Sequence, residues 1–228
     1  MGFAVGADHG RAGVRGVACL AAALALLCAR PLRAADLTVV VTDAAGHPVA
    51  DAVVTATPEG STLPPTAPPV PLVMDQIDET YVPYVMVVPK GGTVTFRNSD
   101  LTRHHVYSYS EAAKFEFVLA PEQIGQRKFD QAGVVALGCN IHDHMIAHLY
   151  VTAAPFAAVT GQDGKARLTG LPAASTTVVA WLPRLKPGTP APQQTVAASS
   201  LGGGPLTMVL PPLVPDSRQA QDPDHGSN

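Results

Sequence analysis

Glycine and proline recur too often along this chain for long helices to form. The 20 glycines and 22 prolines are 42 of its 228 residues, whereas charged residues are only 14%. Glycine and proline weaken the interiors of helices and favour turns. Because apolar residues still reach 46%, there is enough material for a core built from short strands. We therefore predict an all-β fold.

The central region shows this pattern most clearly. Strand-like runs alternate there with short breaks of Gly, Pro, Asn and Asp. In order they are YVPYVMVV, TVTFRN, HHVYSYS, KFEFVL, QRKF, GVVALGC and HLYVT. Short strands at this spacing are typical of a sandwich or barrel, and we predict one domain over residues 70–153.

Two further strand-forming segments flank this domain. LTVVVTDAAGHPVADAVVTATP precedes it, with a Gly-containing turn at residues 43–46 that predicts a hairpin. AAVTGQDGKARLTGLPAASTTVVAWLP follows it and has three strand-like runs. The prolines of STLPPTAPPVP predict an extended linker over residues 61–69. Residues 188–228 are predicted to be a mostly disordered tail, with a possible strand at residues 206–210.

The flanking segments resemble the two halves of a transthyretin-like, or carboxypeptidase-regulatory-like, β-sandwich. Neither half can bury a core alone, since a lone hairpin is marginal in water. We therefore expect residues 35–60 and 154–187 to form one small sandwich, interrupted by the central domain. The alternative is that each flank extends the central barrel.

The N-terminal region has the organisation of a secretory signal peptide over residues 1–34. Arg11 and Arg15 precede an apolar run from 16 to 29, and small residues follow near Ala34. The run is shorter than the roughly 18 residues of a spanning helix. We therefore expect a periplasmic protein without a membrane span after cleavage.

The charge of the mature chain excludes some partners. Removing residues 1–34 leaves 11 basic and 17 acidic side chains, a net charge of −6. No basic patch predicts nucleic-acid binding, and no Lys/Arg-rich amphipathic stretch predicts binding to an anionic membrane.

Cys139 is the only cysteine left after that cleavage, because Cys19 and Cys28 lie in the signal region. A single cysteine in an exported protein can form an intermolecular bridge, act as a reactive thiol or bind a metal. Its surroundings favour the metal.

The loop that follows this cysteine reads C-x2-H-x2-M, with Cys139, His142 and Met145 between two strand-like runs. Soft sulfur together with imidazole suits copper, with zinc second. A third strong ligand must come from elsewhere, and the upstream candidates are His104 and His105. Adjacent strand residues point to opposite faces, so only one of them can enter the site.

These motifs resemble amicyanin-type cupredoxins, in which N-x5-H (Asn98 to His104) accompanies C-x2-H-x2-M. Plastocyanin and pseudoazurin are similar. The resemblance implies a cupredoxin-type Greek-key sandwich with one type-1 copper ion. It makes His104, Cys139 and His142 the trigonal ligands and Met145 the axial one. His105 replaces His104 if the register shifts by one residue.

The resemblance also implies supporting roles. Asn98 ties the histidine loop to the cysteine loop, and Asn98 and the amide of Asn140 tune the redox potential. Redox protein partners touch an apolar patch of Ile141, Met145 and Ile146 around His142. Asp143 and His144 lie on the rim of that patch. The wider arrangement resembles exported bacterial proteins named for methylamine utilisation.

The predicted function is a periplasmic shuttle for single electrons. Taken singly, Cys139 and Met145 could be core residues and the histidines could be surface residues. Two other functions are copper delivery, favoured by the extra His105, His144 and His148, and a structural sandwich module without redox activity. An enzyme is not expected, because no paired carboxylates, Ser-His-Asp set, HExxH or phosphate-binding glycine loop is found.

Overall fold

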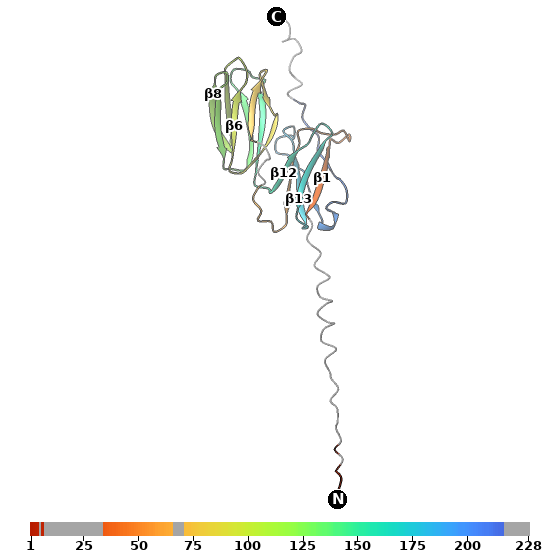
Figure 1. Cartoon of the computed structure of the whole chain (residues 1–228). Coiled ribbons are helices and arrows are strands. Elements are labelled where there is room, and N and C mark those ends of the chain that lie inside the picture. The colour runs from red at the N-terminus through yellow and green to blue at the C-terminus, as the bar shows by residue number, and fades with distance from the viewer. Residues whose placement is uncertain (5, 7–33, 66–70, 217–228) are drawn as a thin grey trace. The chain divides into compact units, whose positions relative to one another are not determined.

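A computed structural model describes residues 1–4, 6, 34–65 and 71–216 of the chain (Figure 1). Almost all of the expected signal region therefore lies outside the described residues. In the described part the regular elements are sixteen strands and one short 3-10 turn, Ala198–Ser200. None of the described segments forms a helix that is long and apolar enough to cross a membrane. The predicted all-β fold class is confirmed.

The central domain is a sandwich of two sheets, drawn in yellow to green in Figure 1. One sheet has the order β5-β11-β10-β7-β8 and the other β4-β3-β6-β9. Its strands are β3 (Val73–Ile77), β4 (Thr80–Val82), β5 (Val85–Pro89), β6 (Gly92–Asn98), β7 (His104–Ser110), β8 (Ala113–Leu119), β9 (Ile124–Phe129), β10 (Gly133–Cys139) and β11 (Ile146–Thr152). Of these, β3 is a strand that the sequence pattern did not predict.

The core of this sandwich follows from alternation along the strands. In β7, every second residue from His104 to Ser108 is buried, while the residues between them are more exposed. Phe96 is fully buried and packs against Phe115 and Phe117 at centroid distances of 5.4 and 5.5 Å. Cys139 and Met145 belong to the same buried cluster. The hydrophobic core therefore extends up to the cysteine loop.

The flanking segments pair with each other in two further sheets, with orders β13-β1-β16 and β12-β2-β14-β15. Orange β1 thus lies beside cyan β13, although more than 120 residues separate them in sequence (Figure 1). The strands are β1 (Ala35–Thr42), β2 (Val53–Pro58), β12 (Phe156–Val159), β13 (Lys165–Leu171), β14 (Thr176–Trp181), β15 (Gln193–Val196) and β16 (Leu206–Val209). The two flanks together form a small sandwich, as predicted.

Two expectations are wrong in this sandwich. The first two strands do not form a hairpin, because β1 and β2 lie in different sheets and only a Thr42–Pro48 bridge follows β1. The segment after residue 187 is not mostly disordered up to residue 216. It contains β15, which pairs with β14, and β16, the strand predicted at residues 206–210, which pairs in parallel with β1. Met208 and Leu210 are buried in the core, which explains why this segment is ordered.

The remaining predicted segments are the linker and the end of the tail. Residues 61–65 of the expected linker carry no regular structure, and residues 66–70 lie outside the described part, as do residues 217–228 of the expected tail.

Candidate metal centre

Strand pairing brings the histidine and cysteine segments together at one end of the central sandwich. His104 is the first residue of β7, and Cys139 is the last residue of β10. The two strands are antiparallel neighbours, with Cys139 opposite Val106. His142 lies in the loop between β10 and β11, and this loop turns back where the Met145 amide donates to the His142 carbonyl.

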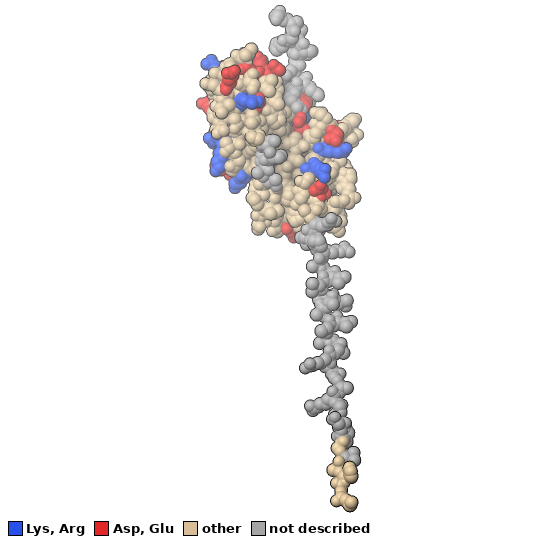
Figure 2. Space-filling view, viewed as in Figure 1, with Lys and Arg blue, Asp and Glu red and all other residues tan. Residues whose placement is uncertain are grey.

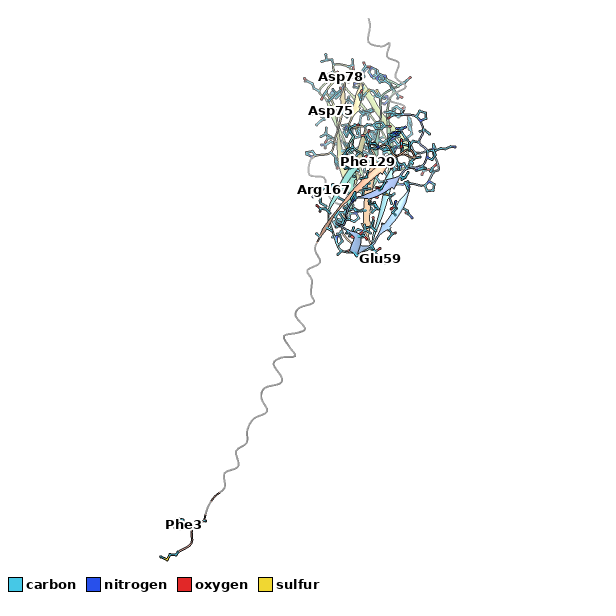
Figure 3. All side chains as sticks on the ribbon, turned by 90° about the vertical axis from the view of Figure 1, so that its right-hand side faces the viewer. Phe3, Glu59, Asp75, Asp78, Phe129 and Arg167 are labelled. Carbon is cyan, nitrogen blue, oxygen red and sulfur yellow. The ribbon has the colours of Figure 1, made fainter. Side chains whose placement is uncertain are left out.

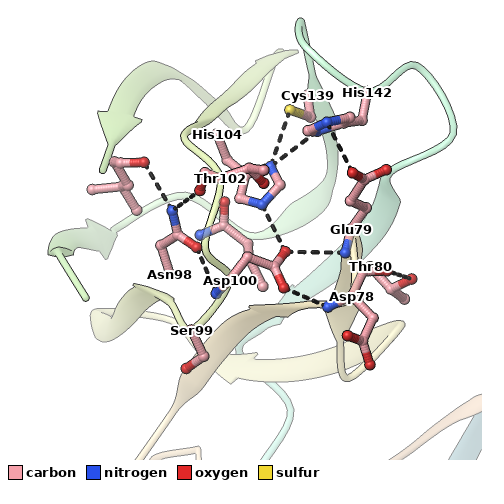
Figure 4. Close-up of polar contacts among 12 residues, drawn as sticks. Asp78, Glu79, Thr80, Asn98, Ser99, Asp100, Thr102, His104, Cys139 and His142 are labelled. Atoms are coloured by element: carbon pink, nitrogen blue, oxygen red, sulfur yellow. Dashed lines mark hydrogen bonds and ion pairs between the residues drawn. The ribbon is translucent and has the colours of Figure 1, made fainter. Parts of the chain in front are cut away.

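Three potential ligand atoms converge there (Figure 4). The Nδ1 atom of His104 lies 3.8 Å from the Cys139 Sγ and 3.2 Å from the His142 Nδ1. One ligand atom from each of these residues lies within 4.8 Å of the others, an arrangement that could hold a metal ion. The exposed fractions are 0% for His104 and 3% for Cys139, whereas His142 is partly exposed.

The outer nitrogens of both imidazoles contact carboxylates. His104 Nε2 lies 2.7 Å from Asp100 Oδ2, and His142 Nε2 lies 3.3 Å from Glu79 Oε1. An ionised carboxylate only accepts hydrogen bonds, so the short contact with Asp100 assigns the His104 proton to Nε2 and leaves the Nδ1 lone pair of His104 facing the site. The Nδ1 atom of His142 lies 3.2 Å from this nitrogen, beside the sulfur. A cation at this position would accept a lone pair from each Nδ1 atom.

The donor set fits a small three-coordinate ion. Nitrogen and sulfur ligands about 2.0 to 2.3 Å from a metal, spread about 120° apart, lie roughly 3.5 to 3.7 Å from one another. The distances of 3.2 and 3.8 Å bracket this range. Two imidazoles and a thiolate form the trigonal set that copper prefers when a weak thioether ligand is available.

Asp100 connects the His104 side of the site to the turn between β3 and β4. Besides His104, its carboxylate accepts the backbone N–H groups of Asp78 (2.5 Å) and Glu79 (3.0 Å). Burial alone would raise the pKa of Asp100, but the hydrogen bonds from Glu79, His104 and Asp78 lower it below its ordinary value. Asp100 is therefore held as an anion that orients the His104 ring.

Glycine fits the strand position before the cysteine because a larger residue would displace the Tyr107 ring. A Cβ atom on Gly138 would lie 2.7 Å from the Cζ atom of Tyr107, whose ring covers this position. The Gly138 carbonyl accepts a hydrogen bond of 2.9 Å from the Tyr81 hydroxyl. Burial, followed by the charges of Cys139 and Tyr107, raises the pKa of Tyr81, which keeps this hydroxyl a donor. These contacts fix the backbone next to the thiol.

Two expected supporting residues, Asn98 and Asn140, make other contacts than predicted. Asn98 donates to the carbonyls of Thr102 and Leu119 and accepts from the Asp100 amide, so it braces the histidine loop and β8. None of these three hydrogen bonds reaches the cysteine loop. The Asn140 amide donates to the His105 carbonyl rather than to the thiolate.

His105 supplies the connection between the two loops. Its ring lies on the outer face of β7, 3.0 Å from the Asn140 side chain and 3.2 Å from Glu116. It is therefore not a member of the converging group, because neighbouring strand residues point to opposite faces.

The remaining loop residues divide into buried and exposed ones. Met145 is 1% exposed and belongs to the core, so it is not part of a surface patch. Ile141 is 48% exposed beside His142. His144 lies at the rim, 3.6 Å from Glu79, and His148 lies in β11.

Sequence reasoning missed Asp100 and Glu79. Asp100 stands four residues before His104, and this spacing could have suggested a partner for the ring. Glu79 comes from a separate hairpin, and no local pattern links it to the cysteine loop.

No family model matches the sequence, and no curated protein matches it significantly. Solved structures match part of the chain. A mutant of amicyanin in the Cu(I) form is 24% identical over 43% of this chain and 99% of that chain, with a TM-score of 0.34. A purple cupredoxin from Nitrosopumilus maritimus is 21% identical over 36% and 99%, with a TM-score of 0.33.

A copper-containing nitrite reductase from Thermus scotoductus is 22% identical, with a TM-score of 0.33. The match covers 42% of this chain but only 25% of that chain. Similarity at this level establishes neither a family nor a function for this chain, and the site has to be interpreted from its own geometry.

Proposed function

We propose that the protein is an exported type-1 copper protein that carries single electrons between redox partners. His104, Cys139 and His142 are the proposed strong ligands, and Met145 is the proposed weak axial ligand. The observation that carries the proposal is the convergence of a buried thiol with two imidazole Nδ1 atoms whose Nε2 atoms contact carboxylates. When bound, copper supplies one-electron chemistry by changing between its two common oxidation states.

Fast electron transfer requires ligands that keep their positions during the change of charge. His104 and Cys139 are held at the ends of adjacent strands in a packed core. Asp100 holds the ring of His104, and the turn at Met145 closes the loop that carries His142. These contacts limit the movement of the ligands when the ion changes charge. They therefore favour electron transfer over exchange of the ligands.

His142 is the route to the surface, since the other two strong ligands are buried. Its side chain is 18% exposed. Leu101, which is 96% exposed, belongs to the histidine loop, and Ile141 precedes His142. We propose that redox proteins dock near His142 through such apolar side chains, in the small and short-lived contacts typical of electron transfer.

Copper delivery is the second candidate. The observation that favours it is His144 beside Glu79 at the rim of the site, where an incoming ion could first be bound. The burial of His104 and Cys139 opposes it, because a delivered ion must leave. A structural module without redox activity explains neither the buried thiol nor the facing imidazoles, and no feature of the site favours an enzyme.

Copper titration followed by voltammetry tests the proposal. Purified mature protein is titrated with Cu(II) while the visible absorption is recorded, and we expect one ion per chain with an intense band. Cys139→Ser should abolish the band. The matched control is Ser108→Ala, a buried substitution on the same sheet, which should keep it. Reversible one-electron voltammetry supports the shuttle, whereas copper loss on reduction supports delivery.

The exported location belongs to the same proposal. The expected cleavage after Ala34 predicts a mature chain that begins at Ala35. Mass spectrometry of the protein from the periplasmic fraction would measure this, and a full-length mass in the cytoplasm would contradict it.

A further inference from the structure

The turn between β3 and β4 has an unusual sequence for its backbone. Ile77 pairs with Thr80, so Asp78 and Glu79 form a two-residue hairpin turn. Both residues are left-handed, with φ angles of 50° and 52°. Turns of this type favour Asn-Gly or Asp-Gly, because a glycine adopts positive φ without strain. A glutamate at the second position is therefore a departure from what local stability favours.

Asp100 compensates for this departure. Its two carboxylate oxygens accept the backbone N–H groups of Asp78 and Glu79, one each. The same carboxylate accepts from His104 Nε2 at 2.7 Å. The strained turn is thus anchored directly to a residue that orients one proposed metal ligand (Figure 4).

The side chain of Glu79 then reaches the other exposed part of the site. Its Oε1 atom lies 3.3 Å from His142 Nε2, and its Oε2 atom lies 3.6 Å from His144 Nε2. Glu79 is held between these rings although its side chain is 44% exposed. In Figure 2, acidic side chains gather at one end of the central sandwich. Figure 3 labels Asp78 at the same end.

Backbone strain retained at such a position indicates a functional role. We propose that Glu79 is a positioning residue that clamps His142 in the tautomer presenting Nδ1 to the metal and lowers the reduction potential of the site. The inference rests on the proposed copper function. Asp100 and Glu79 would thus orient one histidine each, and the shared turn joins the two.

Two consequences follow from the contact with Nε2. A ring whose Nε2 atom contacts Glu79 cannot rotate to offer Nε2 inward without losing this contact, so His142 stays in place when the ion loses charge. The negative charge beside the ligand stabilises the more highly charged oxidised ion. Partners of metal-bound histidines change metal affinity by about 10- to 100-fold, and the half-exposed Glu79 should lie at the lower end.

The first test uses metal-free protein with ¹⁵N-labelled histidine, studied by NMR at about pH 8, where free imidazole is neutral. We expect His142 to carry its proton on Nε2, with Nδ1 unprotonated. In Glu79→Ala the two tautomers should mix. A wild-type ring that is already mixed, or one unchanged by the substitution, would overturn the clamp.

The second test is the reduction potential of the copper-loaded protein. Glu79→Gln removes the charge while keeping the size, and should shift the Cu(II)/Cu(I) affinity ratio about tenfold, which is about 59 mV for a one-electron couple. The potential should rise. Glu116→Gln is the matched control, because Glu116 also contacts a histidine, His105, that lies outside the converging group. An equal rise in both variants would reduce the effect to general surface charge and overturn the inference.

A further variant separates positioning from folding. Asp78→Asn combined with Glu79→Gly gives the turn its favoured sequence, so the melting temperature should stay the same or rise. The potential should nevertheless rise as in Glu79→Gln. A wild-type potential in this variant would contradict the proposal.

The two proposals can fail separately. If copper does not bind but the NMR shows the clamped tautomer, the copper function is wrong and the clamp of His142 remains. If copper binds with its visible band but neither Glu79 variant changes the tautomer or the potential, only the clamp is wrong.

Discussion

The two sandwiches of this chain bury different kinds of side chain. Among the described residues, the buried polar groups of the flanking sandwich are Thr55, Thr160, Thr176 and Asp216. Besides Ser108 and Thr152, the central sandwich buries Asp75, Gln76, Asn98 and His104, and the thiol of Cys139 as well. Buried groups of this kind are costly unless they are hydrogen-bonded or bind a ligand.

This difference indicates that the two sandwiches have different roles, structural support and metal binding. The flanking core consists of aliphatic residues and Met208, packed as a structural support requires. The central core ends at polar groups that contact one another: Arg97 donates to Asp75, Asp100 contacts His104, and His104 faces His142. We therefore expect changes in the two sandwiches to separate stability from metal binding.

The largest expected effect comes from core truncation. Leu149 and Leu168 are 0% and 3% exposed, one in each sandwich. Replacing either with alanine should cost about 2 to 5 kcal/mol of the stability of its own sandwich. Leu149→Ala should also lower the urea midpoint at which the copper band disappears. Leu168→Ala should change the far-UV circular dichroism transition while the band keeps its wild-type midpoint.

Loss of the copper band at the same lowered urea midpoint in both variants would contradict this separation of the two sandwiches. It would mean that the two sandwiches unfold as one cooperative unit.

The next effect concerns the carboxylate on His104. Asp100→Asn removes the charge that orients the ring, and copper binding should weaken about 10- to 100-fold. Competition with a chelator, followed at the visible band, measures this. Asp36→Asn is the control, because Asp36 pairs with Arg167 on the flanking sandwich. Equal affinity in wild type and Asp100→Asn would show that the contact does not orient the ligand.

Much of this fold could be predicted from the sequence, because short apolar runs between Gly and Pro breaks mark strands directly. Cys139, His142 and Met145 could be found for a similar reason, since they share one loop. Alternation along β7 also explains why one of two adjacent histidines enters the site.

What could not be predicted depends on contacts between distant segments. β3 contains Asp75 and Gln76, buried polar residues that interrupt the apolar pattern of a strand. The burial of Met208 depends on parallel pairing of β16 with β1, which no local signal shows. Glu79 reaches His142 through the three-dimensional fold, and Asn98 turns toward Thr102 and Leu119 rather than the cysteine loop.

A smaller effect is expected from the ion pair between buried Asp75 and exposed Arg97. Burial alone would raise the pKa of Asp75, but hydrogen bonds from Arg97, Ser99 and the Gln76 amide lower it below its ordinary value. A lowered folded-state pKa stabilises the fold above the unfolded value of about 3.9. That stability is lost as the pH falls through the folded value.

Asp75→Asn should therefore cost about 1 to 2 kcal/mol at pH 7, less than a fully buried pair because Arg97 is largely exposed. The free energies of unfolding of wild type and Asp75→Asn, measured by chemical denaturation from pH 7 down to about pH 2, should converge at acid pH. A constant difference across this range would contradict the assigned ionisation.

The smallest effect is expected at His105. His105→Ala removes the contacts with Asn140 and Glu116 on the outer face of β7. Contacts of this exposed kind contribute about 0 to 1 kcal/mol, and the copper band should keep its wavelength and stoichiometry. Loss of the band would instead make His105 a ligand and shift the register of the site by one residue.

X-ray absorption at the copper edge of the loaded protein tests the central claim most directly. We expect one short sulfur scatterer, from Cys139, together with two imidazole nitrogens in the first coordination sphere. Coordination by oxygen and nitrogen alone, without sulfur, would contradict the account.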